Sequence, residues 1–171
     1  DSEREKTIQL FSYLEWCLWN ADDDMKNFQR NLSTGELEIE GSTIYHKTEY
    51  RERRNHYALY SVNTPVDGFD TSRDAFLGTY GSPAAPVVVK EGKASKAHGW
   101  SPIASHQINV SLAPGESRSY IFVLGYVENE EEEKWEAPGI INKTKAHQLL
   151  SRYQSDEAVE KAFTELTDYW Q

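Results

Sequence analysis

The chain of 171 residues has the length of one domain built around a single hydrophobic core. Its 18 basic and 28 acidic residues give a formal charge of −10, so phosphate backbones and anionic lipid headgroups would repel it. We therefore expect neither nucleic acid nor a membrane among its partners. The longest strongly apolar stretch, residues 8–19, is interrupted by polar residues and is too short to cross a bilayer. No signal peptide is visible, so the expected location is the cytoplasm.

Three predicted strands lie in the first third of the chain. Residues 7–14 carry apolar side chains at even positions, which is typical of a strand. Residues 36–45 alternate glutamates with apolar residues until Gly41 interrupts them, which predicts a half-buried strand with a bulge at the glycine. Residues 55–63 alternate in the same way and are rich in aromatic side chains, so they predict a further strand.

A β-hairpin is predicted in the second half of the chain. Residues 108–112 and 120–126 both alternate apolar side chains, and Pro114 and Gly115 lie between them. Proline presets φ and glycine supplies a positive φ in such a turn. By contrast, residues 65–105 are rich in Gly, Pro, Ser and charge, which indicates long connections that run over a sheet.

Two helices are predicted at the C-terminal end. Asn142 is positioned to cap a helix that runs through Tyr153, and Ser155 begins a second helix with acidic residues in its first turn. The second helix carries one apolar stripe, formed by Val159, Ala162, Phe163, Leu166 and Trp170. These patterns therefore predict a mainly β chain over residues 1–127, followed by two α-helices within residues 128–171.

Residues suited to metal or nucleophilic chemistry are scattered. The five histidines lie in separate segments and Cys17 stands alone, so we expect no metal site. No nucleophile-elbow, phosphate-loop or dinucleotide-binding string is present. Asp67 and Asp70 suggest a glycosidase acid and base pair, but we favour a turn at Asp67-Gly68 and a cap at Asp70 because aspartate is a common turn former.

One polar string has the chemistry of a sugar or phosphate site. Asn27, Gln29 and Arg30 offer amide and guanidinium donors that match sugar hydroxyls or phosphate, and Phe28 offers an apolar face. A surface loop anchored by Phe28 is the alternative interpretation.

Five long strings distinguish the sequence from a generic β-domain. They are residues 11–21 (FSYLEWCLWNA), 27–36 (NFQRNLSTGE), 41–54 (GSTIYHKTEYRERR), 99–106 (GWSPIASH) and 124–129 (LGYVEN). These strings closely resemble the cellobiose phosphorylase family, and the similarity runs essentially from end to end. Chitobiose phosphorylases are similar more loosely.

The resemblance implies a part of a large, cytoplasmic, homodimeric enzyme. Such enzymes cleave cellobiose or a related β-glucoside with inorganic phosphate as co-substrate, without a further cofactor, and release α-glucose 1-phosphate and glucose with inversion. The family combines an N-terminal β-sandwich, a helical linker and a catalytic barrel of α/α hairpins. By resemblance, residues 1–127 correspond to the later part of the sandwich and residues 128–171 to the linker. The fold class that this implies is an antiparallel β-sandwich followed by two C-terminal α-helices.

The resemblance also divides the functional residues. The family's catalytic acid is an aspartate of the barrel, and no residue here matches it, so we assign no catalytic residue and expect the isolated chain to be inactive. Sandwich loops of the family reach the neighbouring subunit's pocket. The resemblance therefore favours substrate binding by Asn27, Phe28, Gln29 and Arg30.

A second hypothesis is a free-standing carbohydrate-binding β-sandwich module. Exposed rings stack on the apolar faces of sugars, and Trp19, Trp100 or the tyrosines would serve as platforms. If the chain is part of a longer enzyme, part of the stripe formed by Phe163, Leu166 and Trp170 is expected to be solvent-exposed or packed on a second chain. Full burial of all three side chains within this chain would favour an independently folding domain.

Overall fold

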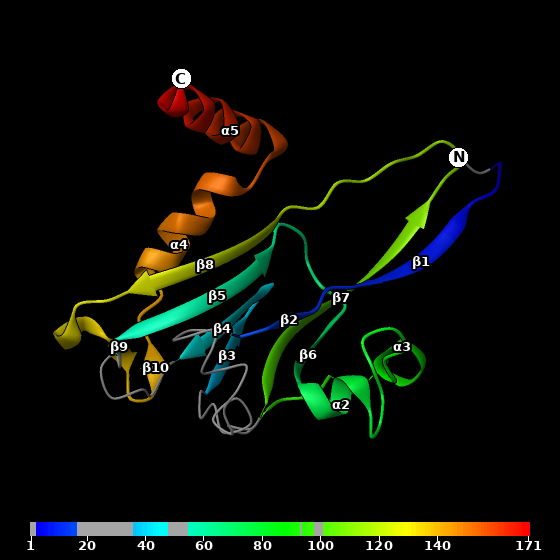
Figure 1. Ribbon diagram of the computed structural model, residues 1–171, viewed down its shortest axis with the longest axis horizontal. Helices are drawn as coiled ribbons and strands as arrows, with labels where there is room; N and C mark the ends of the chain where they lie inside the picture. The colour runs from blue at the N-terminus through cyan, green and yellow to red at the C-terminus, as the bar shows by residue number, and fades with distance from the viewer. Residues whose placement is uncertain (1–2, 17–35, 48–54, 93, 98–100) are drawn as a thin grey trace.

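The described part of the chain folds as two four-stranded antiparallel β-sheets, followed by a two-stranded hairpin and C-terminal helices, as Figure 1 shows. This computed structural model describes residues 3–16, 36–47, 55–92, 94–97 and 101–171. The predicted fold class, mainly β with an antiparallel sandwich and helices at its C-terminal end, is confirmed. No described helix is long and apolar enough to cross a membrane.

The first sheet is built on one long strand. Its four strands are β1 (Lys6–Phe11), β2 (Leu14–Glu15), β6 (Gly68–Ser72) and β7 (Pro102–Leu112). β1 and β2 follow each other along β7 in a single antiparallel register, from Lys6 opposite Leu112 to Glu15 opposite Ile103. β6 also pairs antiparallel with β7. Two short helices, α2 (Arg73–Leu77) and α3 (Val88–Glu91), follow β6.

The second sheet has the order β3-β4-β5-β8, and all its pairs are antiparallel. Its strands are β3 (Leu37–Glu40), β4 (Thr43–Lys47), β5 (His56–Val62) and β8 (Phe122–Glu128). The central strands are the most deeply buried: Tyr45, Tyr57 and Leu59 are each fully inaccessible to solvent.

A small hairpin and the helix that follows it cover one face of this second sheet. After the 3₁₀ turn η2 (Glu131–Glu133), β9 (Trp135–Ala137) pairs with β10 (Ile140–Ile141). Then come α4 (Thr144–Leu150), the 3₁₀ turn η3 (Ser151–Tyr153) and α5 (Asp156–Trp170). Ile141 and Ala146 pack with Tyr45, Tyr57 and Leu59 in one apolar cluster, so this layer completes the core on that face.

The other face of the second sheet packs on the first sheet. Val62 of β5 forms a buried cluster with Ile108 and Val110 of β7, and Leu10 and Phe122 pack against it. Apolar side chains from two sheets thus meet in one layer, which is the defining contact of a sandwich.

The predicted hairpin between residues 108–112 and 120–126 is wrong, although the turn inside it is right. The amide of Glu116 donates to the carbonyl of Ala113 at 3.0 Å, and Gly115 has a φ of 75°. However, β7 pairs with β1, β2 and β6, whereas β8 pairs with β5 in the other sheet. β1 pairs with β7 beside the turn, and the returning chain crosses to the second sheet.

Two further expectations need correction. Residues 36–45 form two strands, β3 and β4, and Gly41 (φ 57°) lies in the tight turn between them rather than in a bulge. Residues 65–105 are more than connections, since they contain β6, α2, α3 and the start of β7. Gly and Pro punctuate these short elements closely, which hides their periodicity.

Candidate functional site

The candidate site is the end of the second sheet where β4 stops. Trp16 and Glu36 are the described residues on either side of residues 17–35, and both contact β4. The Trp16 ring stacks on His46, with ring centroids 5.4 Å apart and an interplanar angle of 27°. The amide of Lys47 donates to the carbonyl of Glu36 at 3.0 Å. Trp16 and Glu36 therefore both lie beside the last two residues of β4.

Lys47 is a buried cation at this end of the sheet. Only 2% of its surface is exposed. Its Nζ lies 2.9 Å from Glu36 Oε2, 2.9 Å from Glu38 Oε1 and 2.8 Å from the carbonyl of Gly139. Three oxygens therefore satisfy the three N–H donors of the ammonium group.

A second buried lysine shares Glu38 with Lys47. Lys143 is the residue before α4. Its Nζ lies 2.8 Å from Glu38 Oε2, 3.2 Å from Glu136 Oε1 and 3.2 Å from the carbonyl of Ile141. The amide of Ile141 also donates to Glu38 Oε1 at 3.0 Å. We call this set the β4-end ion cluster; it consists of Glu36, Glu38, Lys47, Glu136 and Lys143.

Within the β4-end ion cluster, Glu38 and Lys47 are held in their charged forms. Burial alone would raise the pKa of Glu38, but hydrogen bonds from Lys143, the Ile141 amide and Lys47 keep it below its usual value. Burial alone would lower the pKa of Lys47, but hydrogen bonds to Glu36 and Glu38 raise it. Glu38 and Lys47 therefore do not change protonation near neutral pH. The cluster is suited to clamping β3, β4 and the β9–β10 hairpin together rather than to acid–base catalysis.

On the opposite face of β4, His46 is buried without a polar partner. Burial lowers the pKa of its imidazole to about 4, and neither ring nitrogen meets a hydrogen-bond partner among the described residues. A neutral ring stacked on Trp16 behaves as an apolar packing group. His46 therefore fixes Trp16 at the start of residues 17–35 by packing.

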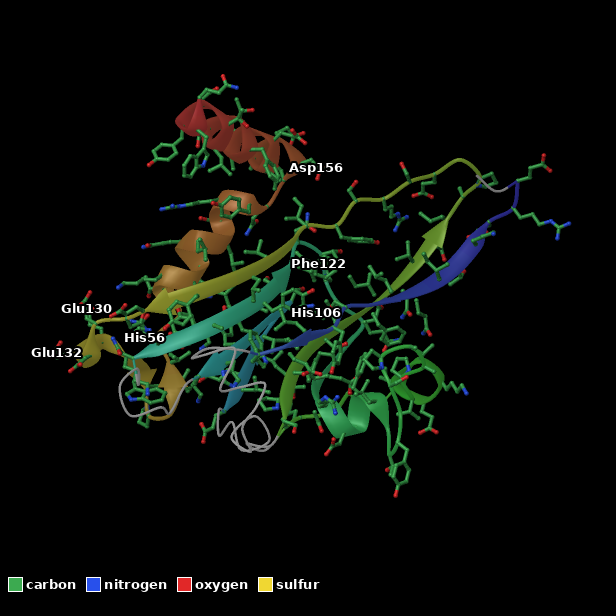
Figure 2. All side chains as sticks on the ribbon, in the orientation of Figure 1. His56, His106, Phe122, Glu130, Glu132 and Asp156 are labelled. Atoms are coloured by element: carbon green, nitrogen blue, oxygen red, sulfur yellow. The ribbon has the colours of Figure 1, made fainter. Side chains whose placement is uncertain are left out.

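His106 joins the two sheets, and Figure 2 shows it beside Phe122. Its ring centroid lies 5.0 Å from that of Tyr60 and 6.2 Å from that of Phe122, and its Nδ1 lies 3.2 Å from Ser12 Oγ. Burial lowers its pKa to about 4. This histidine belongs to the core.

Two more histidines make polar contacts near the sheet edges. His56 Nδ1 hydrogen-bonds to the Tyr126 hydroxyl, and its Nε2 lies 3.4 Å from Glu128 Oε1. His147 Nε2 lies 2.7 Å from Glu40 Oε2. In the part of the chain that the structure describes, no three His, Cys, Asp or Glu side chains gather as a metal site would need.

The proposed substrate-binding residues Asn27, Phe28, Gln29 and Arg30 lie outside the described residues, as do Trp19 and Trp100. The structure does describe both aspartates, Asp67 just before β6 and Asp70 within it. Asp67 Oδ2 accepts from the amide of Asn109 at 2.6 Å, and Asp70 Oδ1 accepts from the amide and hydroxyl of Ser95 at 2.8 and 2.6 Å.

Both aspartates are thus structural anchors, as the favoured interpretation proposed. Two details of that interpretation differ from the structure. Gly68 begins β6 and the amide of Asp67 donates to the carbonyl of Gln107 in β7 at 2.9 Å, so the predicted turn at Asp67-Gly68 is instead the start of a strand. Ser72 rather than Asp70 caps α2, because its hydroxyl accepts from the amide of Ala75. Asp70 instead holds the segment at Ser95 against β6.

Sequence reasoning missed the β4-end ion cluster. The glutamates of β3 look like the wet side of a half-buried strand, but Glu38 and Glu40 face Lys143 and His147. The spacing of Lys143 and His147, four residues apart and hence on one helical face, is the available signal for a basic patch. Nothing local connects that patch to a strand about a hundred residues earlier.

Comparison with known proteins places this arrangement in a family. Residues 1–156 match the family described as "Glycosyl hydrolase 94, supersandwich domain". The chain is 25% identical over 173 aligned positions to an N,N'-diacetylchitobiose phosphorylase of Vibrio proteolyticus, and 24% identical over 172 positions to one of Vibrio furnissii. Each alignment covers 99% of this chain but only 20% of the relative, so the chain spans about one fifth of their length.

Proposed function

Because the chain belongs to the glycosyl hydrolase 94 family through its supersandwich domain, we propose that it is the non-catalytic part of a phosphorylase that acts on cellobiose. The match of residues 1–156 to that domain carries the proposal. Two relatives named as phosphorylases support the reaction class. The preference for cellobiose is supported by the five strings that resemble cellobiose phosphorylases.

The proposed reaction is inverting phosphorolysis. An oxygen of inorganic phosphate attacks the anomeric carbon of the β-glucoside, the glycosidic bond breaks, and a carboxylic acid protonates the departing oxygen. The products are α-glucose 1-phosphate and glucose. In this proposal the acid lies in the longer protein outside these 171 residues, and the present chain supplies no catalytic residue.

The proposed role of this chain is to line the substrate pocket of a partner subunit in a cytoplasmic homodimer. Asn27, Phe28, Gln29 and Arg30 are the proposed contacts, because amide and guanidinium donors suit sugar hydroxyls and phosphate. The β4-end ion cluster and the Trp16–His46 stack support this role, since they fix both neighbours of the segment that carries these residues.

The substrate test uses the longer protein that carries this chain. We expect phosphate-dependent release of glucose 1-phosphate from cellobiose, with weaker release of the corresponding sugar phosphate from N,N'-diacetylchitobiose. A preference for the acetylated disaccharide would assign the protein to the substrate class of the named relatives. The pure 171-residue chain should release no glucose 1-phosphate, and steady turnover by it would contradict the non-catalytic role.

The rim test is Arg30→Ala in the longer protein. Loss of a charge-assisted contact is worth about 1.5–3 kcal/mol, so kcat/KM should fall roughly ten- to a hundredfold while the protein stays folded. The matched control is Arg118→Ala, which removes an exposed arginine paired with Glu116 beside the 113–116 turn. Equal kinetics for both variants would leave Arg30 as an ordinary surface residue.

The competing function is a free-standing carbohydrate-binding module. A true module keeps its affinity in isolation, whereas a pocket rim needs the partner's catalytic part. We therefore expect the 171-residue chain to show no binding to cellobiose or to soluble β-glucan in calorimetry. Saturable binding that disappears in Trp19→Ala or Trp100→Ala would favour the module.

A further inference from the structure

The outer edge of β8 has no role in the proposed function. β8 is the last strand of its sheet, and β5 is its strand partner among the described residues. The amide of Asn63 donates to the carbonyl of Ile121 at 3.1 Å. The amide of Asn129 donates to the carbonyl of Asn55, also at 3.1 Å. In an antiparallel pair, hydrogen-bonded residues alternate, so the odd-numbered residues of β8 bond to β5.

The even-numbered residues of β8 therefore present their backbone to the open side. Phe122 and Leu124 direct N–H and C=O groups away from β5, and no described strand receives them. Natural sheets protect such edges with lysine, proline or a covering element, because an open edge pairs with other chains. Phe122 to Val127 contains neither lysine nor proline, and Leu124 is 61% exposed.

Hollows flank this edge on both sides, and Leu124 lines both. One hollow of about 440 Å³ lies between β8 and α5, where Phe163 and Leu166 form its far wall. In Figure 2 the start of α5, at Asp156, lies above the Phe122 end of β8. The other hollow, of about 380 Å³, lies between β8 and β2 and is lined by Leu14 and Trp16. An added strand alternates its side chains between two faces, so it would fill both hollows.

Charge indicates which kind of strand fits. α5 contains five acidic residues and one lysine, and the glutamates of η2 follow β8. A second copy of this chain, with its formal charge of −10, would bring like charges together. A strand that carries lysine or arginine beside alternating apolar residues would suit the acidic surface formed by α5 and η2. The relatives are about five times as long as the part matched here, so their remaining length offers such segments.

We propose that the open edge of β8 pairs with an extended strand that the longer polypeptide supplies from outside these 171 residues, with alternating apolar side chains and flanking basic ones. The inference rests on the proposed function only in treating the chain as part of a longer protein. Substrate and reaction do not enter it.

Amide hydrogen exchange tests the pairing without measuring activity. In the longer protein the amides of Phe122 and Leu124 should exchange at least a hundredfold more slowly than in the 171-residue chain. The amides of Val123 and Gly125 face β5 and should be protected in both, which makes them internal controls. Equal exchange of Phe122 and Leu124 in the two proteins would overturn the proposal. So would protection in the short chain that accompanies its dimerisation in sedimentation, because a second copy would then be the occupant.

A variant pair tests the apolar part of the same contact. Leu124→Lys places an ammonium group between the two hollows and should speed exchange of the Phe122 amide at least tenfold in the longer protein. Ile140→Lys is the matched control, because Ile140 is an exposed apolar residue of β10. Equal exchange at Phe122 in both variants would overturn the proposal. The two proposals can fail separately. If the longer protein does not release glucose 1-phosphate from cellobiose but the two variants differ in exchange at Phe122, the proposed function is wrong and the strand pairing stands.

Discussion

Two histidines, His46 and His106, are buried in the core. Burial lowers the pKa values of His46 and His106 to about 4. An unfolded histidine titrates near 6.5, so between about pH 6.5 and pH 4 the unfolded chain binds protons that the folded chain excludes. The stability that these residues contribute is therefore complete above pH 6.5 and is lost as the pH falls toward 4.

The first prediction concerns His46→Phe, which keeps an aromatic ring against Trp16 and removes the titrating group. A shift of about 2.5 pH units corresponds to roughly 3 kcal/mol, so the loss of unfolding free energy between pH 7 and pH 4 should shrink by about that amount. Urea unfolding at both pH values measures it. Gln in place of the exposed His147 is the control, and an acid sensitivity equal to that of the control would contradict the prediction.

Gly125 is a residue whose missing side chain makes room for a helix. A Cβ at this position would lie 2.8 Å from Leu149 Cδ2 and 3.1 Å from Leu59 Cγ. Leu149 can move, but Leu59 is fully buried. We therefore predict that Gly125→Ala lowers the unfolding free energy by about 1–3 kcal/mol. In a Leu149→Ala background the penalty should become smaller, and an unchanged penalty would show that α4 does not rest on this strand.

At the scale of elements, Glu38 connects β3 to three other segments through Lys47, Lys143 and the Ile141 amide. Glu38→Gln leaves two buried ammonium groups with less compensating charge. Breaking a buried ion pair costs about 3–5 kcal/mol, and we expect the lower end because Glu36 and Glu136 remain. Chemical unfolding of the chain measures this cost.

Glu40→Gln on the same strand is the control for Glu38→Gln, since Glu40 is exposed and an exposed ion pair contributes less than about 1 kcal/mol. The pH dependence has a definite sign. The pKa of Glu38 lies below its unfolded value, so its contribution is present above about pH 4.5 and is lost as the pH falls through the folded pKa. Equal stability of the two variants at pH 7 would contradict the clamp.

Local patterns predicted the elements well and their partners poorly. Alternation located β1, β5 and β8, because each packs one face on a core. Capping chemistry located α5, since Ser155 Oγ accepts from the amide of Ala158 at 3.3 Å. Pairing of β8 with β5, rather than with β7, depends on which strand edges are already occupied. That property belongs to the whole sandwich, and no local pattern carries it.

The candidate site was predictable only in part for the same reason. The Asn27 to Arg30 string was selected by chemistry and resemblance, and it lies outside the described residues. The β4-end ion cluster joins Glu38 to Lys143 across about a hundred residues, so only the folded chain brings the two charges together.

At the scale of the whole molecule, the chain exposes apolar surface that a sandwich usually covers. Phe163, Leu166 and Trp170 are 63%, 54% and 77% exposed, which confirms the expectation for the stripe of the last helix. Side chains that are already wet contribute little to folding. Each would contribute roughly 1.5–3 kcal/mol once fully buried by another part of a longer protein.

The last prediction follows from that difference between the short and long proteins. Replacing all three residues by Gln should change the unfolding free energy of the 171-residue chain by less than about 1 kcal/mol, because glutamine keeps helix propensity and little packing is lost. The same triple variant should lower the thermal stability of the longer protein markedly, since the stripe would lose buried contacts there. A matched change on the polar face of α5, in which Glu160 and Thr164 become Gln, should leave both proteins nearly unaffected. A large loss in the short chain alone would show that α5 folds back on its own sandwich in solution.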